Sequence, residues 1–238
     1  MGVISALARR WRKGQRELRE HLRGLFEAQR VDGAIDVGAH RGKYFRFLRE
    51  DVGFRGPVLS VEPIAELARA LEPRAAADGN WRVVRCALGA NAGSARLNVM
   101  ASSDFSSLLD PSEASTRQFA GLNAVARTEE VPLRTLDELV AAALPAPRRL
   151  YLKLDTQGYD LEVLRGGPRT LERVVALQSE ISFIPLYAGM PSWRESIERI
   201  EALGFAASGV FAVSRDASLR LVEADCVFVR ADESTPHG

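Results

Sequence analysis

The sequence predicts an α/β fold in which a mostly parallel sheet of seven main strands is covered by helices on both faces. After Gly33, short apolar runs alternate with helical segments, which is typical of strand–helix–strand units. These runs are too apolar for one face of the sheet to meet water, so both faces are expected to be buried. The final two runs, 206–213 and 220–230, have no helix between them, which predicts a C-terminal antiparallel hairpin at the end of the sheet.

An amphipathic helix is predicted ahead of the α/β region. Apolar residues recur at roughly helical spacing over residues 3–29, and seven arginines and lysines make this segment basic. Its basic face either meets an anionic lipid or a polyanionic substrate carrier, or it is the solvated face of a capping helix. Gly14 is expected to interrupt the helix. We divide the chain into this helix (1–30), one domain (31–230) and a loose tail (231–238).

The remaining elements follow from hydrophobic periodicity. The predicted strands are Ala34–Val37, Val58–Glu62, Arg82–Ala87, Arg96–Met100, Glu129–Leu133, Leu150–Asp155, Val174–Phe183, Ala206–Val213 and Cys226–Arg230. The predicted helices cover residues 43–50, 64–71, 135–143, 159–165 and 192–203. Arg96–Met100 and Glu129–Leu133 are expected to form an inserted β element outside the main sheet.

Composition excludes several classes of protein. Lys and Arg number 32 against 31 Asp and Glu, so the net charge of +1 gives no argument for a nucleic-acid partner, and none is expected. Two cysteines, Cys86 and Cys226, and three histidines support neither a disulfide framework nor a Cys/His zinc site. No apolar stretch approaches the roughly 18 residues of a membrane span, and no signal peptide is recognised, which predicts a cytoplasmic protein.

The segment AIDVGAHRGKY, residues 34–44, carries the most information about a ligand. An apolar strand is followed by two glycines four residues apart and then by a helical pattern, so the backbone can approach a ligand closely above a helix N-terminus. Twenty residues after Gly42, a second strand ends in Glu62, whose carboxylate can accept both ribose hydroxyls of an adenosine ligand. The residues assigned to cofactor binding here are Asp36, Gly38, Ala39, His40, Gly42, Tyr44, Glu62 and Pro63.

The identity of the ligand follows by comparing nucleotide-binding motifs. The loop is not a Walker A motif, because three residues separate Gly38 from Gly42 and Tyr44 follows Lys43. His40 stands where a dinucleotide fingerprint needs a second close-approach glycine, so a pyrophosphate would be crowded. An adenosine ligand without a pyrophosphate fits better, and S-adenosylmethionine is the obvious one. A nicotinamide-dependent oxidoreductase is kept as the alternative enzyme.

Seven segments in order resemble the FkbM family of S-adenosylmethionine-dependent O-methyltransferases. They are IDVGAHRGKY, SVEP, VVRCALG, the Ser-Ser-Leu of 106–108, LRTLDEL, LKLDTQGYDLEVLRGG and QSEISFIPLYAG. The resemblance implies a Rossmann-like class I methyltransferase fold and methylation of a small-molecule hydroxyl. The acceptor is expected to be a sugar unit, which includes a glycan or a carrier-linked sugar, or a secondary metabolite. The resemblance also implies that Ala87 and Leu88 surround the adenine. His40 departs from the family, which usually has Asn at that position.

The catalytic candidates follow the predicted strand that ends at Asp155. Asp155 can accept the proton of the acceptor hydroxyl or hold a metal that lowers the pKa of this hydroxyl, and Gln157 and Tyr159 can orient it. Alternatively, Asp155 caps the following helix. Lys153 points to the same side of the strand, as a partner that keeps a carboxylate ionised or as an ordinary ion-pair residue.

Glu180 is the second candidate for a base or metal ligand, because a carboxylate inside an apolar run is costly without a site or partner. It can equally point outward beyond the buried part of its strand. Asp155, Glu180 and Gln157 offer oxygen ligands for a divalent ion, so a metal stays open, although a carboxylate base acting without metal suffices. We also assign to cofactor binding Ser107, in the Ser-rich loop after residue 100, and Asp155. A cofactor-binding scaffold without turnover is the alternative outside enzymes, and the oligomeric state and the identity of the acceptor are not predicted.

Overall fold

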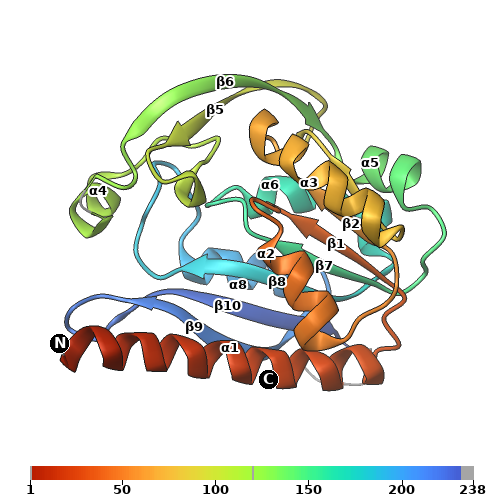
Figure 1. The fold of residues 1–238 in the computed structure, drawn as a ribbon, viewed down its shortest axis with the longest axis horizontal. Coiled ribbons are helices and arrows are strands. Elements are labelled where there is room, and N and C mark those ends of the chain that lie inside the picture. Colours follow the sequence, from red (N-terminus) through yellow and green to blue (C-terminus); the bar gives the residue numbers. More distant parts are fainter. Residues whose placement is uncertain (1, 120, 232–238) are drawn as a thin grey trace.

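A computed structural model of the chain describes residues 2–119 and 121–231. Its main sheet has seven strands in the order β3-β2-β1-β7-β8-β10-β9 (Figure 1). These strands are β1 (Gly33–Val37), β2 (Val58–Val61), β3 (Trp81–Val84), β7 (Leu150–Leu154), β8 (Val174–Ser182), β9 (Phe205–Arg215) and β10 (Leu221–Arg230). The first five strands in chain order run parallel, and β10 pairs antiparallel with both β8 and β9. This confirms the predicted α/β class, the seven strands and the C-terminal hairpin.

A smaller sheet carries the predicted inserted β element. It consists of β4 (Ala87–Leu88), β6 (Val125–Arg134) and β5 (Gly93–Met100), in the order β4-β6-β5. The predicted strand Arg82–Ala87 is therefore wrong as a single element. Its first part pairs with β2 in the main sheet, while Ala87 pairs with Leu133 of β6 in the second sheet. One apolar run can serve two sheets, and its hydropathy does not reveal where the pairing partner changes.

The helices lie on both faces of the main sheet (Figure 1). They are α1 (Gly2–Ala28), α2 (Lys43–Arg46), the π-helix η1 (Phe47–Val52), α3 (Ala65–Asp78), the 3₁₀ helix η2 (Ser103–Phe105), α4 (Glu113–Phe119), α5 (Leu136–Ala143), α6 (Asp160–Arg165), α7 (Pro168–Leu171) and α8 (Trp193–Ala202). Neighbouring strand residues serve opposite faces: Ile35 packs with the cluster beneath α5 to α8, whereas Ala34 packs with the cluster beneath α1 to α3. This alternation produces the two-sided burial that the apolar strands predicted.

The N-terminal helix α1 runs along β9 at one side of the molecule, opposite the arch of β5 and β6 (Figure 1). Its buried residues Leu18, Leu22, Leu25 and Phe26 join the core around Tyr151. The helix continues through Gly14, so the predicted interruption is wrong. A Cβ at Gly14 would lie 3.0 Å from the Ala212 carbonyl oxygen, and glycine therefore allows α1 to approach β9 closely.

The predicted division at residues 30 and 230 stays a prediction, and the predicted tail lies outside the described residues after Ala231. No helix within the described ranges combines the length and the hydropathy that a bilayer crossing requires.

Candidate functional site

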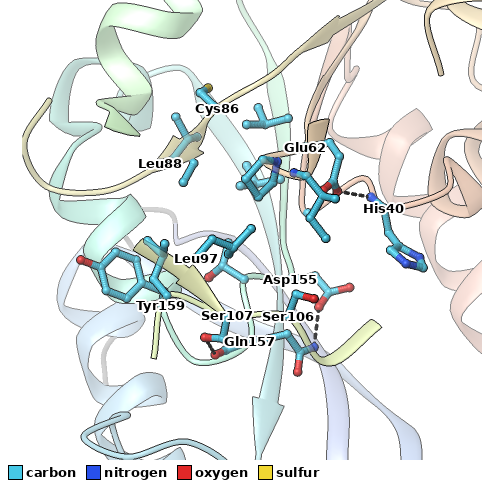
Figure 2. A pocket seen from close by; sticks show the side chains of 18 of the residues that line it. His40, Glu62, Cys86, Leu88, Leu97, Ser106, Ser107, Asp155, Gln157 and Tyr159 are labelled. Atoms are coloured by element: carbon cyan, nitrogen blue, oxygen red, sulfur yellow. Dashed lines mark hydrogen bonds between the residues drawn. The ribbon is translucent and has the colours of Figure 1, made fainter. Parts of the chain in front are cut away.

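A cavity of about 710 Å³, partly open to solvent, lies where β1, β2 and β7 end. In open α/β sheets this edge, at the carboxyl ends of the strands, is where ligands bind. Figure 2 shows Glu62 and His40 toward one end of this cavity and Tyr159 toward the other. The cavity is lined by Val37, Gly38, His40, Val61, Glu62, Pro63, Ile64, Cys86, Ala87, Leu88, Leu97, Ser103, Asp104, Ser106, Ser107, Leu108, Asp155, Thr156, Gln157 and Tyr159. We call it the cofactor cavity.

The glycine loop after β1 holds two strand ends together. Gly38 has a φ of +82°, and a Cβ at this position would lie only 2.0 Å from the carbonyl oxygen of Asp155. The glycine is therefore required by the approach of the β7 end, in addition to any approach by a ligand. Gly42 (φ +68°) does not line this cavity, and a Cβ there would meet side chains of α3 and β3. Its glycine is explained by the left-handed turn before α2.

Glu62 ends the β2 segment with its carboxylate in the cofactor cavity. One oxygen accepts a hydrogen bond from the backbone N–H of His40 at 2.7 Å, and the other accepts from the N–H of Ile64 at 2.8 Å (Figure 2 shows the first). Burial raises the pKa of Glu62 to about 7, and the two backbone donors only partly offset this effect. The carboxylate thus changes charge near neutral pH.

Apolar side chains form the part of the cofactor cavity farther from His40. Ile64, Leu88 and Leu97 are buried, and Ala87 of β4 lines the same cavity. Such walls suit the faces of a flat aromatic base, which gains from burial of apolar area. Leu97 comes from the inserted sheet, so this sheet closes the cavity that the main sheet opens.

Asp155 follows β7 immediately and is joined to Lys153. The Lys153 Nζ lies 3.1 Å from Asp155 Oδ2 and 3.2 Å from Asp36 Oδ1, and all three residues come from the paired strands β1 and β7. Burial alone would raise the pKa of Asp155, but the Lys153 ammonium and a hydrogen bond from Gln157 outweigh burial and hold it below its ordinary value. Helix α6 begins five residues later, at Asp160, so Asp155 does not cap it.

Gln157 connects Asp155 to Glu180. Its Nε2 donates to Asp155 Oδ1 at 2.9 Å and to Glu180 Oε2 at 2.8 Å, while its Oε1 accepts from the hydroxyl of Tyr187 at 2.6 Å. The amide nitrogen carries two hydrogens, so it can donate to both carboxyl groups at once. Gln157 also has a φ of +55°, a strained conformation for a residue other than glycine, and such strain concentrates at functional sites.

A second, wider cavity lies on the other side of Asp155, with about 1660 Å³ of space that includes open solvent. It is bounded by α1, α2 and η1, and we call it the groove. Gly38, His40, Asp104 and Asp155 line both the groove and the cofactor cavity. The groove is lined by Gln15, Arg16, Leu18, Arg19, Gly38, Ala39, His40, Lys43, Tyr44, Arg46, Phe47, Asp51, Asp104, Lys153, Asp155, Gln178, Glu180, Val213 and Asp225.

The floor of the groove holds two buried carboxyl groups whose pKa values are raised. Glu180 of β8 stands opposite Asp225 of β10 in the antiparallel register. Burial and the charges of Asp155, Glu223 and Asp225 raise the pKa of Glu180 well above its ordinary value, and burial raises the pKa of Asp225 to about 6. Asp155 is therefore ionised at neutral pH, whereas the pKa of Glu180 is shifted in the direction that favours its protonated form.

Contacts of His40 with Ser103 and Asp104, which we call the clasp, join the glycine loop to the inserted element at the boundary of the two cavities. The Nε2 of His40 lies 2.7 Å from Ser103 Oγ, and its Nδ1 lies 3.2 Å from Asp104 Oδ1. Burial lowers the pKa of His40, so the ring is neutral at neutral pH. Ser107, four residues after Ser103, donates a hydrogen bond to the carbonyl oxygen of Gln157 at 2.8 Å.

Most of the residues predicted from the sequence lie around these cavities. Those that line the cofactor cavity are Gly38, His40, Glu62, Pro63, Ala87, Leu88, Ser107, Asp155 and Gln157. Ala39, Tyr44 and Glu180 line the groove instead. Asp36 and Gly42 line neither cavity, and the fully buried Asp36 acts through Lys153.

Sequence reasoning missed the roles of Ser103, Leu97 and the Tyr187 hydroxyl. Ser103 and Leu97 depend on how the inserted sheet folds back, which no local pattern reveals. Tyr187 lies in the segment QSEISFIPLYAG, but its bond to Gln157 has no sequence signature. Among the described residues, no three His, Cys, Asp or Glu side chains are grouped so that they could hold a metal ion.

Comparisons with known proteins bear on the family and the fold. A family model described as the methyltransferase FkbM domain matches residues 36–206. The crystal structure of methyltransferase FkbM from Methylobacillus flagellatus KT is similar with a TM-score of 0.52 and 14% identity, over 84% of this chain and 43% of that chain. The chain thus spans less than half the length of that protein. A search of curated proteins found no match.

Two further solved structures are more distant. Fibrillarin from Aeropyrum pernix, with natively bound S-adenosyl-L-methionine, has a TM-score of 0.48 and 12% identity, over 84% of this chain and 66% of that chain. Magnesium protoporphyrin IX methyltransferase from Synechocystis PCC 6803, with bound SAM, has a TM-score of 0.48 and 10% identity, over 94% of this chain and 84% of that chain.

Proposed function

Because the chain belongs to the FkbM methyltransferase family, we propose that it is an S-adenosylmethionine-dependent O-methyltransferase that acts on a hydroxyl of a small molecule, such as a sugar unit or a secondary metabolite. The observation that carries this proposal is the position of Asp155, an ionised carboxylate that lines both the cofactor cavity and the groove. Asp104 also lines both, but its side chain is 55% exposed and paired with His40. Asp155 is the better-placed proton acceptor.

The residues of the cofactor cavity fit S-adenosylmethionine. Glu62 offers a buried carboxylate for the ribose hydroxyls, and Ile64, Leu88 and Leu97 offer apolar walls for the adenine. The methionine part would then extend past Gly38 toward Asp155. When bound, this cofactor supplies a methyl group that is already activated by the positive sulfur. The protein therefore has to orient an acceptor oxygen and take up its proton.

Asp155 takes up this proton in our proposal. Lys153 keeps its carboxylate ionised before the reaction, and Gln157 holds one carboxylate oxygen in place through Nε2. Because Lys153 and Gln157 contact different oxygens of Asp155, its orientation is fixed from both sides. Glu180, whose pKa is raised well above its ordinary value, also accepts a hydrogen bond from Gln157 and serves as a neighbour that tunes Asp155.

The route for the proton does not need a metal ion, since a single carboxylate is chemically sufficient. A divalent cation held by Asp155 and Glu180 is the alternative, because carboxylate oxygens are the ligands that magnesium, manganese and calcium prefer. Chelation separates these two routes, as described in the Discussion. A cytoplasmic location and the absence of a nucleic-acid partner stay predictions.

Two measurements test the proposed function. Isothermal titration of the full chain with S-adenosylmethionine, with S-adenosylhomocysteine and with NAD and NADP identifies the cofactor class. Transfer of a labelled methyl group to a panel of sugars, glycans and cell extract then identifies turnover. Binding of NADP in place of S-adenosylmethionine would support an oxidoreductase instead. S-adenosylmethionine binding without transfer to any acceptor would support a scaffold protein.

A further inference from the structure

One wall of the groove is basic, and it comes from two helices that are distant in sequence. Arg16 and Arg19 project from α1, and Lys43 and Arg46 project from α2. Arg16, Lys43 and Arg46 keep 64–73% of their side chains exposed, and Arg19 keeps 32%. We call these four residues the basic rim.

The basic rim is only loosely paired with protein carboxylates. The nitrogen–oxygen distances are 3.4 Å and 3.7 Å from Arg16 and Arg19 to Glu20, 3.8 Å from Lys43 to Asp104, and 3.9 Å from Arg46 to Glu50. Exposed pairs of this kind contribute at most about 1 kcal/mol each, so an incoming anion can displace them.

Arginines with structural roles in the same region look different. Arg49 is buried and contacts Asp78 through two hydrogen bonds of 2.9 Å and 3.0 Å. Arg23 donates from Nε to the carbonyl oxygen of Asp51 at 2.7 Å. The Nε of Arg19, in contrast, is buried without a hydrogen-bond partner among the described residues. A buried donor without a partner is rare and costly, and an acceptor brought by a ligand would satisfy it.

The floor of the groove has the opposite character to the basic rim. Asp155, Glu180 and Asp225 lie there, and Asp155 is ionised. Asp51 also lines the groove, and Asp104 is bound to His40. An anionic group would be repelled from the floor and attracted to the rim, whereas a hydroxyl can donate to the floor. The groove therefore fits a ligand with a hydroxyl at one end and an anion at the other.

We propose, building on the proposed function, that the methyl acceptor is a sugar-type molecule that carries a phosphate or diphosphate group, and that the basic rim binds this group while a hydroxyl reaches Asp155. A guanidinium group can donate two parallel hydrogen bonds to the oxygens of a phosphate, whereas an ammonium group cannot. The same chemistry is offered by a nucleoside diphosphate sugar and by a sugar on a lipid diphosphate.

The first experiment measures anion binding without turnover. Inorganic pyrophosphate is titrated calorimetrically into the full chain loaded with S-adenosylhomocysteine, at low and at high salt. We expect saturable binding that weakens with salt, and a loss of about tenfold or more in affinity in the variant Arg16→Gln/Arg19→Gln, because a charged hydrogen-bond partner is removed. S-adenosylhomocysteine affinity and the unfolding temperature should remain those of the wild type.

A matched control removes the same charge elsewhere. Arg69 on α3 and Arg82 on β3 are exposed and line neither cavity, so Arg69→Gln/Arg82→Gln should leave pyrophosphate affinity unchanged. If Arg16→Gln/Arg19→Gln fails to fold, Lys43→Gln/Arg46→Gln tests the same rim from α2. Equal losses in the rim and control variants, or no saturable binding, would overturn the proposal.

The second experiment uses turnover to identify the source of the phosphate. Free hexoses, their nucleoside diphosphate forms and their polyprenyl diphosphate forms are compared as acceptors of a labelled methyl group. We expect one diphosphate form to exceed the free sugar in kcat/KM, and this advantage to disappear in the rim variant alone. Methylation of free sugars with equal kcat/KM overturns the anion site but leaves the proposed function intact. If no acceptor is methylated, the proposed function is in doubt and pyrophosphate binding alone decides the anion site.

Discussion

Lys153 stands between Asp36 and Asp155, with its Nζ 3.2 Å from Asp36 Oδ1 and 3.1 Å from Asp155 Oδ2. Asp36 is fully buried and Asp155 borders both cavities, so one ammonium group links the core to the site. We therefore expect the same lysine to contribute to stability through Asp36 and to the proposed reaction through Asp155, and mutation can separate the two contributions.

Lys153→Met should destabilise the fold by roughly 3–5 kcal/mol, because it leaves the buried Asp36 carboxylate without its counter-ion. Adding Asp36→Asn removes that carboxylate, and the double variant should recover much of the loss. Urea unfolding of the four proteins of this cycle measures the coupling. If the two substitutions destabilise additively, the ion pair is not what holds this end of β1 and β7.

Asp155→Asn should lower turnover by roughly 10²–10⁴-fold, the usual contribution of a positioned acid or base, with little change in S-adenosylhomocysteine affinity. Asn keeps the shape of the side chain and its contact with Gln157. On the metal-free route, EDTA leaves the wild type unchanged. Activity that is lost with EDTA and restored by magnesium would exclude this route, and normal turnover of Asp155→Asn would transfer the role of base to Glu180.

Glu62 should make cofactor affinity depend on pH. Its folded pKa of about 7 lies above its ordinary value of 4.5, so the ionised form that accepts ribose hydroxyls becomes populated as pH rises through about 7. S-adenosylhomocysteine should therefore bind more tightly above this pH. Glu62→Gln should weaken binding by roughly 1.5–3 kcal/mol and flatten its pH dependence. A wild-type Kd that is flat across this range would remove Glu62 from the ribose site.

The raised pKa of Glu62 should also make the free energy of unfolding of the cofactor-free protein depend on pH. A carboxyl group whose pKa is raised on folding stabilises the fold below its ordinary pKa, and this contribution is lost as pH rises through the folded pKa. From pH 4.5 to about 7, Glu62 should thus remove roughly 3 kcal/mol from the free energy of unfolding. Glu62→Gln should abolish this part of the pH dependence in denaturant titrations, and an unchanged profile would contradict the assignment.

Gly38→Ala should destabilise the protein by roughly 2–5 kcal/mol, since strain at positive φ adds to overlap with the Asp155 carbonyl oxygen. Gly53 provides the control, because its φ of +86° is close to the +82° of Gly38 and nothing lies within 4 Å of a Cβ there. Gly53→Ala should cost only about 1–2 kcal/mol of strain. Equal losses in thermal unfolding would show that the close approach of β1 and β7 has no energetic role.

His40→Ala should loosen the clasp between the glycine loop and the inserted element. Hydrogen exchange of the amides in residues 103–107 should accelerate, and bound S-adenosylhomocysteine should dissociate faster, because this segment borders the cofactor cavity. His21→Ala is the control: His21 also contacts a serine, Ser208, at 3.0 Å, but neither residue lines the cofactor cavity or the groove. Unchanged exchange in His40→Ala would mean that other contacts hold the segment.

The sequence reveals those parts of the site that lie on single strands. Glu62 and Asp155 were predicted because each carboxylate directly follows an apolar run, and parallel strands bring such ends to one edge. The contacts of His40 with Ser103 and of Gln157 with Tyr187 span 63 and 30 residues. They depend on how the inserted sheet and the loop after β8 fold back, and hydropathy patterns do not encode this.

The split of the predicted strand Arg82–Ala87 has a similar cause. Periodicity reports burial, and Trp81 and Ala87 are both buried, yet they belong to different sheets. The predicted helix interruption at Gly14 was wrong because helix propensity is a local property and glycine has a low one. The close packing of α1 on β9, which favours glycine at this position, is a tertiary contact that propensity does not include.

The packing of α1 on β9 also has a consequence for how the chain folds. His21 and Ser208 are 187 residues apart, so the wall of the groove formed by Arg16 and Arg19 cannot exist until almost the entire domain has collapsed. Contacts this distant in sequence are slow to form and leave the apolar stripe of Leu18, Leu22 and Leu25 open to aggregation or chaperone capture in the meantime. The residues that line the cofactor cavity lie closer together in the sequence than those that line the groove. During refolding the cofactor cavity should therefore form before the groove.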